Sequence, residues 1–305
     1  MTKPPISQSQ KRFQESVGAL FSKSDASDGA QCLFLKSSTD IGVIRNGGRN
    51  GARFAPQSFL STFKKFSQNK TLSELAFYDF EVANHDEEAT DFHLAQKKEA
   101  ERISAILKSR PSSRICHLGG GHDHIYPLLT AVSKTFEKVI VINIDAHADT
   151  RTDEEFHSGT PFRQFANEFS GEFHLFQIGL HPFANSFSTL SPLNKAQGKT
   201  LWKKEMNKES VEQFFAHIKK VMTPKTLVIF SLDADALVGS EVPGVSAVNP
   251  GGLTRTELLE VWECYRKLPL EHLPVMGIYE LNPLYDTLSS FSMRTIASFV
   301  FESFG

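Results

Sequence analysis

The feature that most constrains the fold is a series of short apolar runs separated by longer amphipathic stretches. This alternation is typical of α/β proteins, in which helices join parallel strands. It predicts strands at residues 31–36, 75–80, 113–118, 138–145, 172–180, 226–233 and 273–281. It predicts helices at residues 56–66, 91–109, 125–136, 161–169, 211–222, 255–268 and 289–304. We therefore expect an α/β fold with a mainly parallel β-sheet.

The length and composition favour one large domain. The 305 residues are 40% hydrophobic and include 26 Phe, which is ample apolar mass for a single core. No linker or internal repeat divides the chain, so residues 29–305 are predicted to form one domain. Residues 1–28 are polar, and we expect a loosely held N-terminal segment there. Residues 181–199 are rich in Ser, Asn and Pro and are predicted to form a long loop.

The charge balance excludes several classes of partner. There are 33 basic and 35 acidic residues, and no basic block favours nucleic acid or an anionic membrane surface. The first residues lack the apolar region of a secretory signal, and no run of about 18 apolar residues predicts a membrane span. The cysteines, Cys32, Cys116 and Cys264, show no paired spacing. We expect a cytoplasmic protein that acts on a small molecule.

Metal-binding side chains follow three of the predicted strands. The stretch "VINIDAHADTR" ends an apolar run with an acid or imidazole at every second position, and "LGGGHDH" and "FSLDADA" are similar. Because ligands bind at the carboxyl ends of parallel strands, these groups should converge on one point. Helix capping explains a single Asp but not the whole set. The six candidate ligands are His122, Asp145, His147, Asp149, Asp233 and Asp235.

Charge counting predicts two ions rather than one. Four carboxylates and two neutral imidazoles carry a charge that two divalent cations balance. This oxygen-rich set without thiolate suits Mn2+ better than structural zinc. Two such ions can share a bridging water and turn it into hydroxide near neutral pH. Asp123 and His124 are expected to orient His122 as hydrogen-bond partners.

Four motifs carry a resemblance to a known superfamily. In this order and at these intervals, "GGGHD", "DAHAD", "SLDAD" and "ELNP" resemble the arginase/agmatinase/formimidoylglutamase (ureohydrolase) superfamily. The resemblance runs from "GVIRNGGRNGARFAP" to the C-terminus. It implies a three-layer αβα sandwich and two Mn2+ per chain, held by the six candidate ligands. It also implies a possible homo-oligomer, since members form trimers or hexamers among other states.

Smaller differences separate the branches of that superfamily. In "FHSGTPF", Ser158 stands where arginases and agmatinases carry His, which resembles formimidoylglutamase. The stretch "VPGVSAVNPGG" and Val238 resemble the same branch. Arg151 stands where arginase has an Asn that binds the substrate carboxylate, and its fork suits a substrate with two carboxylates. A solvated surface arginine is the alternative interpretation of Arg151.

The resemblance thus implies a histidine-degradation enzyme that cleaves N-formimidoyl-L-glutamate to L-glutamate and formamide. A metal-bridging hydroxide would attack the formimidoyl carbon, while Asp149 would orient it and carry its proton. Glu280 resembles the acid that holds the amidine, although a glutamate at a strand end facing water is also possible. His157 is the candidate proton shuttle, and Ser158 is assigned to the substrate pocket.

The Gly-rich stretch "RNGGRNGA" adds two further candidates for substrate binding. It places Asn46 and Arg49 in a loop that offers contacts to a carboxylate, and a purely structural turn is an equal alternative. Two other functions stay open for the chain. A guanidino-compound hydrolase, such as an agmatinase or guanidino-acid hydrolase, would release urea. A non-catalytic descendant is also conceivable, but its intact set of six ligands argues against it.

Overall fold

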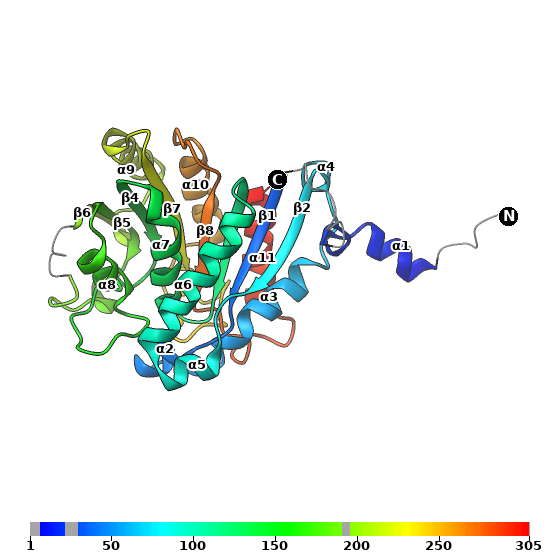
Figure 1. The fold of residues 1–305 in the computed structure, drawn as a ribbon, viewed down its shortest axis with the longest axis horizontal. Helices are drawn as coiled ribbons and strands as arrows, with labels where there is room; N and C mark the ends of the chain where they lie inside the picture. The colour runs from blue at the N-terminus through cyan, green and yellow to red at the C-terminus, as the bar shows by residue number, and fades with distance from the viewer. Residues whose placement is uncertain (1–6, 22–29, 191–195, 305) are drawn as a thin grey trace.

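A single sheet of eight strands organises the computed structural model, which describes residues 7–21, 30–190 and 196–304 (Figure 1). The sheet order is β2-β1-β3-β8-β7-β4-β5-β6, and every neighbouring pair is parallel. The strands are β1 (Ala30–Ser37), β2 (Leu75–Glu81), β3 (Ser113–Gly119), β4 (Lys138–Ile144), β5 (Glu172–Leu180), β6 (Ala196–Trp202), β7 (Thr226–Asp233) and β8 (Val275–Tyr279). The predicted parallel α/β sheet is confirmed.

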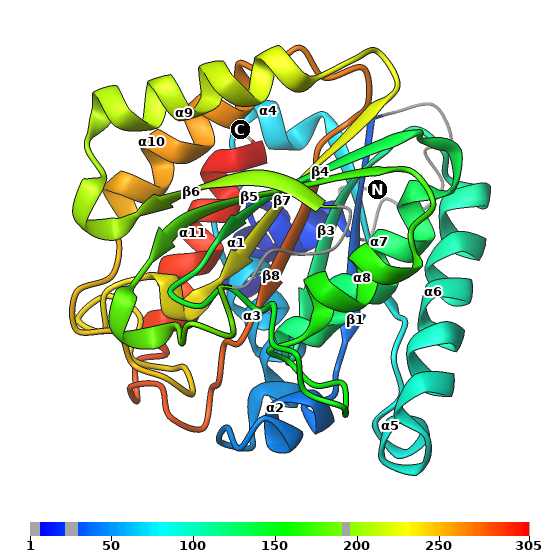
Figure 2. The same cartoon turned by 90° about the vertical axis from the view of Figure 1, so that its left-hand side faces the viewer.

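Helices cover both faces of the sheet, as Figure 2 shows. Successive residues of a strand point to opposite faces, so Ile140 and Ile142 join one core cluster while Val139 and Val141 join the other. The first cluster is covered by α3 (Ala55–Phe63), α9 (Lys208–Val221), α10 (Arg255–Arg266) and α11 (Phe291–Phe304). The second is covered by α6 (Phe92–Ser109), α7 (Ile125–Val132) and α8 (Pro161–Glu168). The predicted three-layer αβα sandwich is therefore confirmed.

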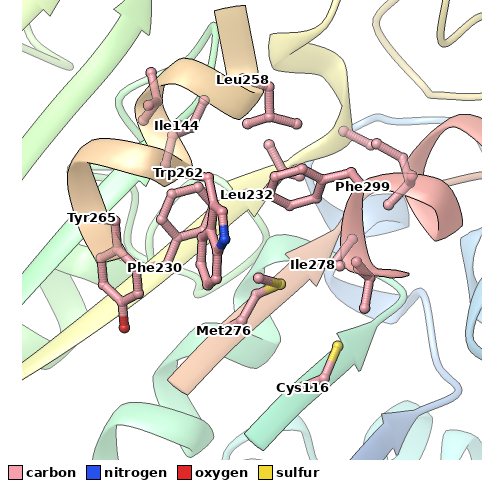
Figure 3. Close-up of a cluster of buried hydrophobic side chains, with 14 of the residues drawn as sticks. Cys116, Ile144, Phe230, Leu232, Leu258, Trp262, Tyr265, Met276, Ile278 and Phe299 are labelled. Atoms are coloured by element: carbon pink, nitrogen blue, oxygen red, sulfur yellow. The ribbon is translucent and has the colours of Figure 1, made fainter. Parts of the chain in front are cut away.

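An aromatic group fixes the central strands against α10 and α11 (Figure 3). The ring of Phe230 on β7 lies edge-on to Trp262, at 5.0 Å between centroids, and contacts Tyr265 at 5.4 Å. Phe299 of α11 completes the group, 5.9 Å from Trp262. These side chains are almost fully buried and leave little freedom for the strands to shift. The carboxyl ends of the central strands are thus held on a rigid base.

The structure differs from the sequence predictions at the edge of the sheet. Residues 196–199 were expected in a long loop, but they begin β6, which pairs with β5. That part of the prediction is wrong because β6 is mostly exposed at the edge, so its composition is polar. Four short helices were also missed, namely α1 (Gln8–Gln14), α2 (Ile41–Arg45), α4 (Lys70–Ser73) and α5 (His85–Thr90). Residues 191–195 lie outside the described residues.

The described part of the N-terminal segment is attached to the body of the protein by backbone hydrogen bonds and by buried side chains. Residues 1–6 and 22–28, which belong to the segment predicted to be loosely held, lie outside the described residues. Between them, Val17 and Leu20 are buried in the core on the α3 side of the sheet.

Among the described helices, none combines the length and the apolar character needed to cross a membrane.

Candidate metal centre

The polar segments predicted from the sequence meet at the carboxyl ends of four neighbouring strands. β3, β8, β7 and β4 lie side by side in the sheet, and each is followed at once by candidate site residues. His122 follows β3, Glu280 follows β8, and Asp145 follows β4. Asp233 ends β7. Because all four strands are parallel, their ends open on the same side of the sheet, where such folds bind ligands.

One group of ligands surrounds the imidazole of His122. Its Nδ1 lies 3.2 Å from Asp145 Oδ2, 2.9 Å from Asp149 Oδ2 and 3.1 Å from Asp233 Oδ2. All four residues are buried, and His122 is fully inaccessible. A single ring nitrogen is thus surrounded by three carboxylates.

A second group lies on the other side of Asp145. His147 Nδ1 is 3.6 Å from Asp145 Oδ1 and 3.1 Å from Asp235 Oδ2. Among the described residues, Asp145 alone belongs to both groups, each of which offers ligand atoms within 4.8 Å of one another. The six candidate ligands therefore form two adjoining sites that share one carboxylate.

The residues present fit a pair of cations. A ring nitrogen carries at most one hydrogen, so His122 Nδ1 cannot donate a full hydrogen bond to each of the three carboxylates around it. Burial opposes a charge on His122, but these carboxylates prevail and raise its pKa well above the ordinary value. Asp235 Oδ1 is buried and has no hydrogen-bond partner among the described residues. Divalent cations would replace the missing donors and neutralise the clustered acids.

Strand β7 also supplies the group that orients His122. Ser231 Oγ lies 2.9 Å from His122 Nε2, so the hydroxyl can accept from this nitrogen and leave Nδ1 free to bind a metal. Asp123 and His124 are not the hydrogen-bond partners of His122 expected from the sequence, so that prediction is wrong. His124 turns to Glu99, with Nδ1 2.9 Å from Glu99 Oε2. The missed signal was the period of two along "SLDAD", which sets Ser231 on the same side as Asp233.

Two acids at the centre adopt a backbone conformation that is rare for residues with a side chain. Asp149 has φ 51° and Glu280 has φ 63°. Such strain persists where the surrounding structure enforces it, and it is frequent at functional sites. Glu280 Oε1 accepts a hydrogen bond of 3.0 Å from the His122 N–H. Burial raises the pKa of Glu280 to about 8, and this hydrogen bond opposes the rise.

A cavity of about 270 Å³ opens above the two groups. Its lining includes the acids of the centre other than Asp145, together with the loops after β1, β4 and β7. Residues of this lining include Asn46, Arg49, His147, Asp149, Arg151, Ser158, Asp233, Asp235, Ser246 and Glu280. The cavity thus joins an acidic floor to a wall that carries arginines.

Three predicted substrate residues form one network in that wall. Asn46 Nδ2 donates to Ser158 Oγ at 3.0 Å, and Arg151 Nη1 donates to Asn46 Oδ1 at 2.9 Å. Arg49 lines the same cavity, but its guanidinium donates to the Val245 carbonyl and stacks 4.0 Å above the ring of Tyr285. Arg49 therefore also holds the loop together.

His157 lies in the loop that presents Ser158 to the cavity. It is absent from the described residues that line the cavity. Its Nδ1 accepts from the Gly159 N–H at 3.0 Å, and its Nε2 lies 2.8 Å from Asp153 Oδ2. Both ring nitrogens thus serve the loop that presents Ser158. These contacts hold the loop in place, and the proton-shuttle role of His157 stays a prediction.

The sequence matches the model of the Arginase family over residues 38–305. This match covers most of the chain and includes every residue of the candidate centre. The chain belongs to the arginase family. The superfamily assignment made from the four motifs is therefore confirmed.

Relatives within the arginase family include formimidoylglutamases. That of Staphylococcus aureus (strain MSSA476) is 29% identical over 255 residues, which are 83% of this chain and 79% of that protein. The crystal structure of formimidoylglutamase from Bacillus subtilis has a TM-score of 0.80 at 23% identity and covers 92% of this chain and 88% of that one. Formiminoglutamase of Trypanosoma cruzi with Mn2+2 has a TM-score of 0.76 at 26% identity, with 95% and 97% covered. This chain therefore shares its fold with both solved structures.

Proposed function

We propose that this arginase-family protein is a binuclear metal hydrolase that converts N-formimidoyl-L-glutamate to L-glutamate and formamide. The observation that carries the proposal is the cavity itself. It joins a centre of two imidazoles and four aspartates, all buried except the half-buried His147, to a wall bearing Arg151 and Ser158. The formimidoylglutamase relatives and the Mn2+2 of the Trypanosoma cruzi protein support the same substrate and metal.

The ligands divide between two ions. His122, Asp149 and Asp233 would hold one Mn2+, His147 and Asp235 would hold the other, and Asp145 would contact both. When bound, such a pair lowers the pKa of a water enough to supply a nucleophile near neutral pH. Ser231 keeps His122 in the tautomer that can bind metal.

Asp149 and Glu280 have separate tasks in the proposed reaction. Asp149 lines the cavity beside the ligands and would take the proton of the nucleophile and pass it to the leaving amine. Glu280 lines the same cavity and would pair with the cationic formimidoyl group. That cation would lower the pKa of Glu280 again, so the carboxylate is charged when substrate is bound.

The wall of the cavity selects the substrate by charge. Arg151 offers a fork for a substrate carboxylate, and its bond to Asn46 holds it at the cavity. A substrate with a distal ammonium, such as agmatine, would lie against this guanidinium and lose several kcal/mol. A guanidino acid carries the same carboxylate, so a guanidino-acid hydrolase remains the alternative function.

A product assay tests the proposed function. We expect N-formimidoyl-L-glutamate to release formamide, with arginine and agmatine turned over at least about a hundredfold less efficiently. This ratio corresponds to about 2.7 kcal/mol of transition-state discrimination. Formamide and urea are measured in parallel at equal substrate concentrations with Mn2+-loaded protein. Preferential urea release from a guanidino acid would instead establish the alternative.

Replacing Arg151 by Met should weaken substrate binding more than catalysis. A carboxylate clamp far from the reacting carbon contributes equally in the ground and transition states, so KM should rise and kcat should change little. A charge-assisted bond is worth about 1.5 to 3 kcal/mol, which predicts a KM increase of about ten- to a hundredfold. Steady-state kinetics of formamide release measure both constants. An unchanged KM would show that Arg151 does not bind the substrate.

The cytoplasmic location, the place in histidine degradation and the homo-oligomeric state stay predictions from the sequence.

A further inference from the structure

A second cluster of buried acids and histidines lies behind the loop that carries His122, away from the cavity lining. It joins Glu88 of α5 to Asp123 and His124, which follow His122 in the turn after β3. These three residues are 2%, 1% and 0% exposed. One oxygen of each acid and one ring nitrogen of His124 lie within 4.8 Å of one another. The proposed hydrolytic function uses none of them.

The hydrogen bonds of this cluster are incomplete among the described residues. Both oxygens of Asp123 and Nε2 of His124 are buried without a hydrogen-bond partner. Asp123 Oδ2 and His124 Nε2 are 3.6 Å apart, which is too long for a hydrogen bond between them. Leaving such groups unpaired costs several kcal/mol, so a native structure normally supplies a partner. A single missing partner would have to contact both His124 Nε2 and the carboxylate of Asp123.

Glu99 prepares His124 to bind a cation. Its Oε2 lies 2.9 Å from His124 Nδ1, while Oε1 accepts from Ser37 Oγ at 2.6 Å. Glu99 is 1% exposed, and both of its oxygens are engaged by these contacts. A carboxylate that accepts from one nitrogen of a histidine directs the other, unprotonated nitrogen toward a metal. In His124 that other nitrogen is the unpartnered Nε2.

The backbone leaves room for the carboxylate of Asp123. A Cβ at Gly42 would lie 2.1 Å from Asp123 Oδ1, and one at Gly121 would lie 2.3 Å from it. Only glycine permits the carboxylate to occupy this position. Glu88 approaches from α5 and accepts a short hydrogen bond from Thr39 Oγ1. Acids from two separate elements are thus brought together, and they repel each other without a cation.

We propose that Glu88, Asp123 and His124 bind a further divalent transition-metal ion, separate from the catalytic pair. Two carboxylates and a neutral imidazole carry the charge that one divalent cation balances, and this ligand set suits Mn2+, Fe2+ or Zn2+ better than Ca2+. Ligand atoms at about 2.0 to 2.2 Å from an ion lie at most about 4.4 Å apart. Small side-chain movements would therefore bring the ligand atoms of these three residues, now within 4.8 Å of one another, to distances at which they can share one ion. A buried water would also supply the missing hydrogen bonds, and the metal content of the protein distinguishes the two occupants.

This ion would fix the turn that carries His122. His122 and His124 belong to the same short 3-10 helix, His122–His124, and Glu88 ties that turn to α5. The ion is thus a structural support for the catalytic ligand. It takes no part in the reaction, so its presence is judged by metal content rather than by activity.

Metal counting with a matched pair of variants tests the site. The wild type, Glu88→Gln and Glu87→Gln are loaded with Mn2+, desalted and analysed for manganese per chain. Glu87 is the neighbouring glutamate and pairs at the surface with Arg102 and Lys98, so its substitution leaves the cluster intact. We expect about three ions in the wild type and in Glu87→Gln, and about two in Glu88→Gln. Equal manganese content in the wild type and Glu88→Gln would overturn the proposal.

The Asp145→Asn variant separates this site from the catalytic pair. It should lose the pair and retain one ion, which would give the hyperfine-split electron paramagnetic resonance spectrum of isolated Mn2+. That measurement needs no change at Glu88, so it decides the matter even where Glu88→Gln does not fold. Asp145→Asn protein that retains no manganese would contradict the further site. Wild-type protein with a single ion that only Glu88→Gln removes would support it and contradict the catalytic pair.

Discussion

Substituting Asp145 by Asn is expected to remove the catalytic metal pair and almost all activity. Asp145 is fully buried, and its two oxygens face His122 and His147, respectively. It is the one described residue shared by the two ligand groups. Asparagine keeps the size and removes the charge, so both ions lose a ligand in one step. Because the ion pair supplies several kcal/mol of transition-state stabilisation, we expect kcat/KM to fall by about a thousandfold or more.

Elemental analysis and formamide release on the same samples check this result. Asp79→Asn is a matched control, because Asp79 lies on the edge strand β2 and pairs with Lys36 and Lys64, away from the cavity. It should keep the metal and the activity of the wild type. If Asp145→Asn kept both the manganese pair and the activity, the binuclear assignment would have to be abandoned.

The candidate metal ligands could be listed from the sequence because they follow the ends of apolar runs. A buried parallel strand makes an unbroken apolar run, and its end is marked by the first polar residues. β4 ends at Ile144, so Asp145, His147 and Asp149 lie in the loop after it, and strand alternation does not place them. The structure adds the path of this loop and the order of strands, which brings β3, β8, β7 and β4 together. No single motif contains that order.

Other features depend on tertiary contacts that the sequence does not display. Ser231 looked like an ordinary strand residue until the structure placed it 2.9 Å from His122 Nε2. The polar strand β6 was missed because an edge strand needs few apolar residues. The contact of Ser231 joins residues far apart in the chain, whereas β6 is defined by its pairing with β5 rather than by its own composition.

The cluster of Glu88, Asp123 and His124 illustrates the same point. Glu88 is 35 residues away from Asp123 in the chain, and its helix α5 is too short to be recognised from periodicity. Asp123 and His124 were interpreted as partners of His122 because they are its neighbours in sequence. Their side chains instead face Glu88 and Glu99. Adjacent residues in a tight turn can serve two separate sites.

Glu280→Gln is expected to lower kcat/KM strongly while leaving the metal pair in place. Glu280 is buried at the cavity and would be the partner of the cationic formimidoyl group. Removing one member of a buried charge pair costs about 2 to 5 kcal/mol, so a loss of about thirtyfold or more is expected. Glutamine retains an oxygen that can still accept from the His122 N–H, so the turn that holds His122 should not move.

Comparison with Asp145→Asn distinguishes the loss of a substrate contact from the loss of metal. Both substitutions replace a buried carboxylate by an amide at the same centre, but only Asp145 belongs to the ligand groups. Manganese content and the kinetics of formamide release are measured on the two variants together. Glu280→Gln should hold as much metal as the wild type and still be slow, whereas Asp145→Asn should be slow because the pair is lost. Full activity in Glu280→Gln would mean that the amidine binds elsewhere, since a neutral amide cannot balance its charge.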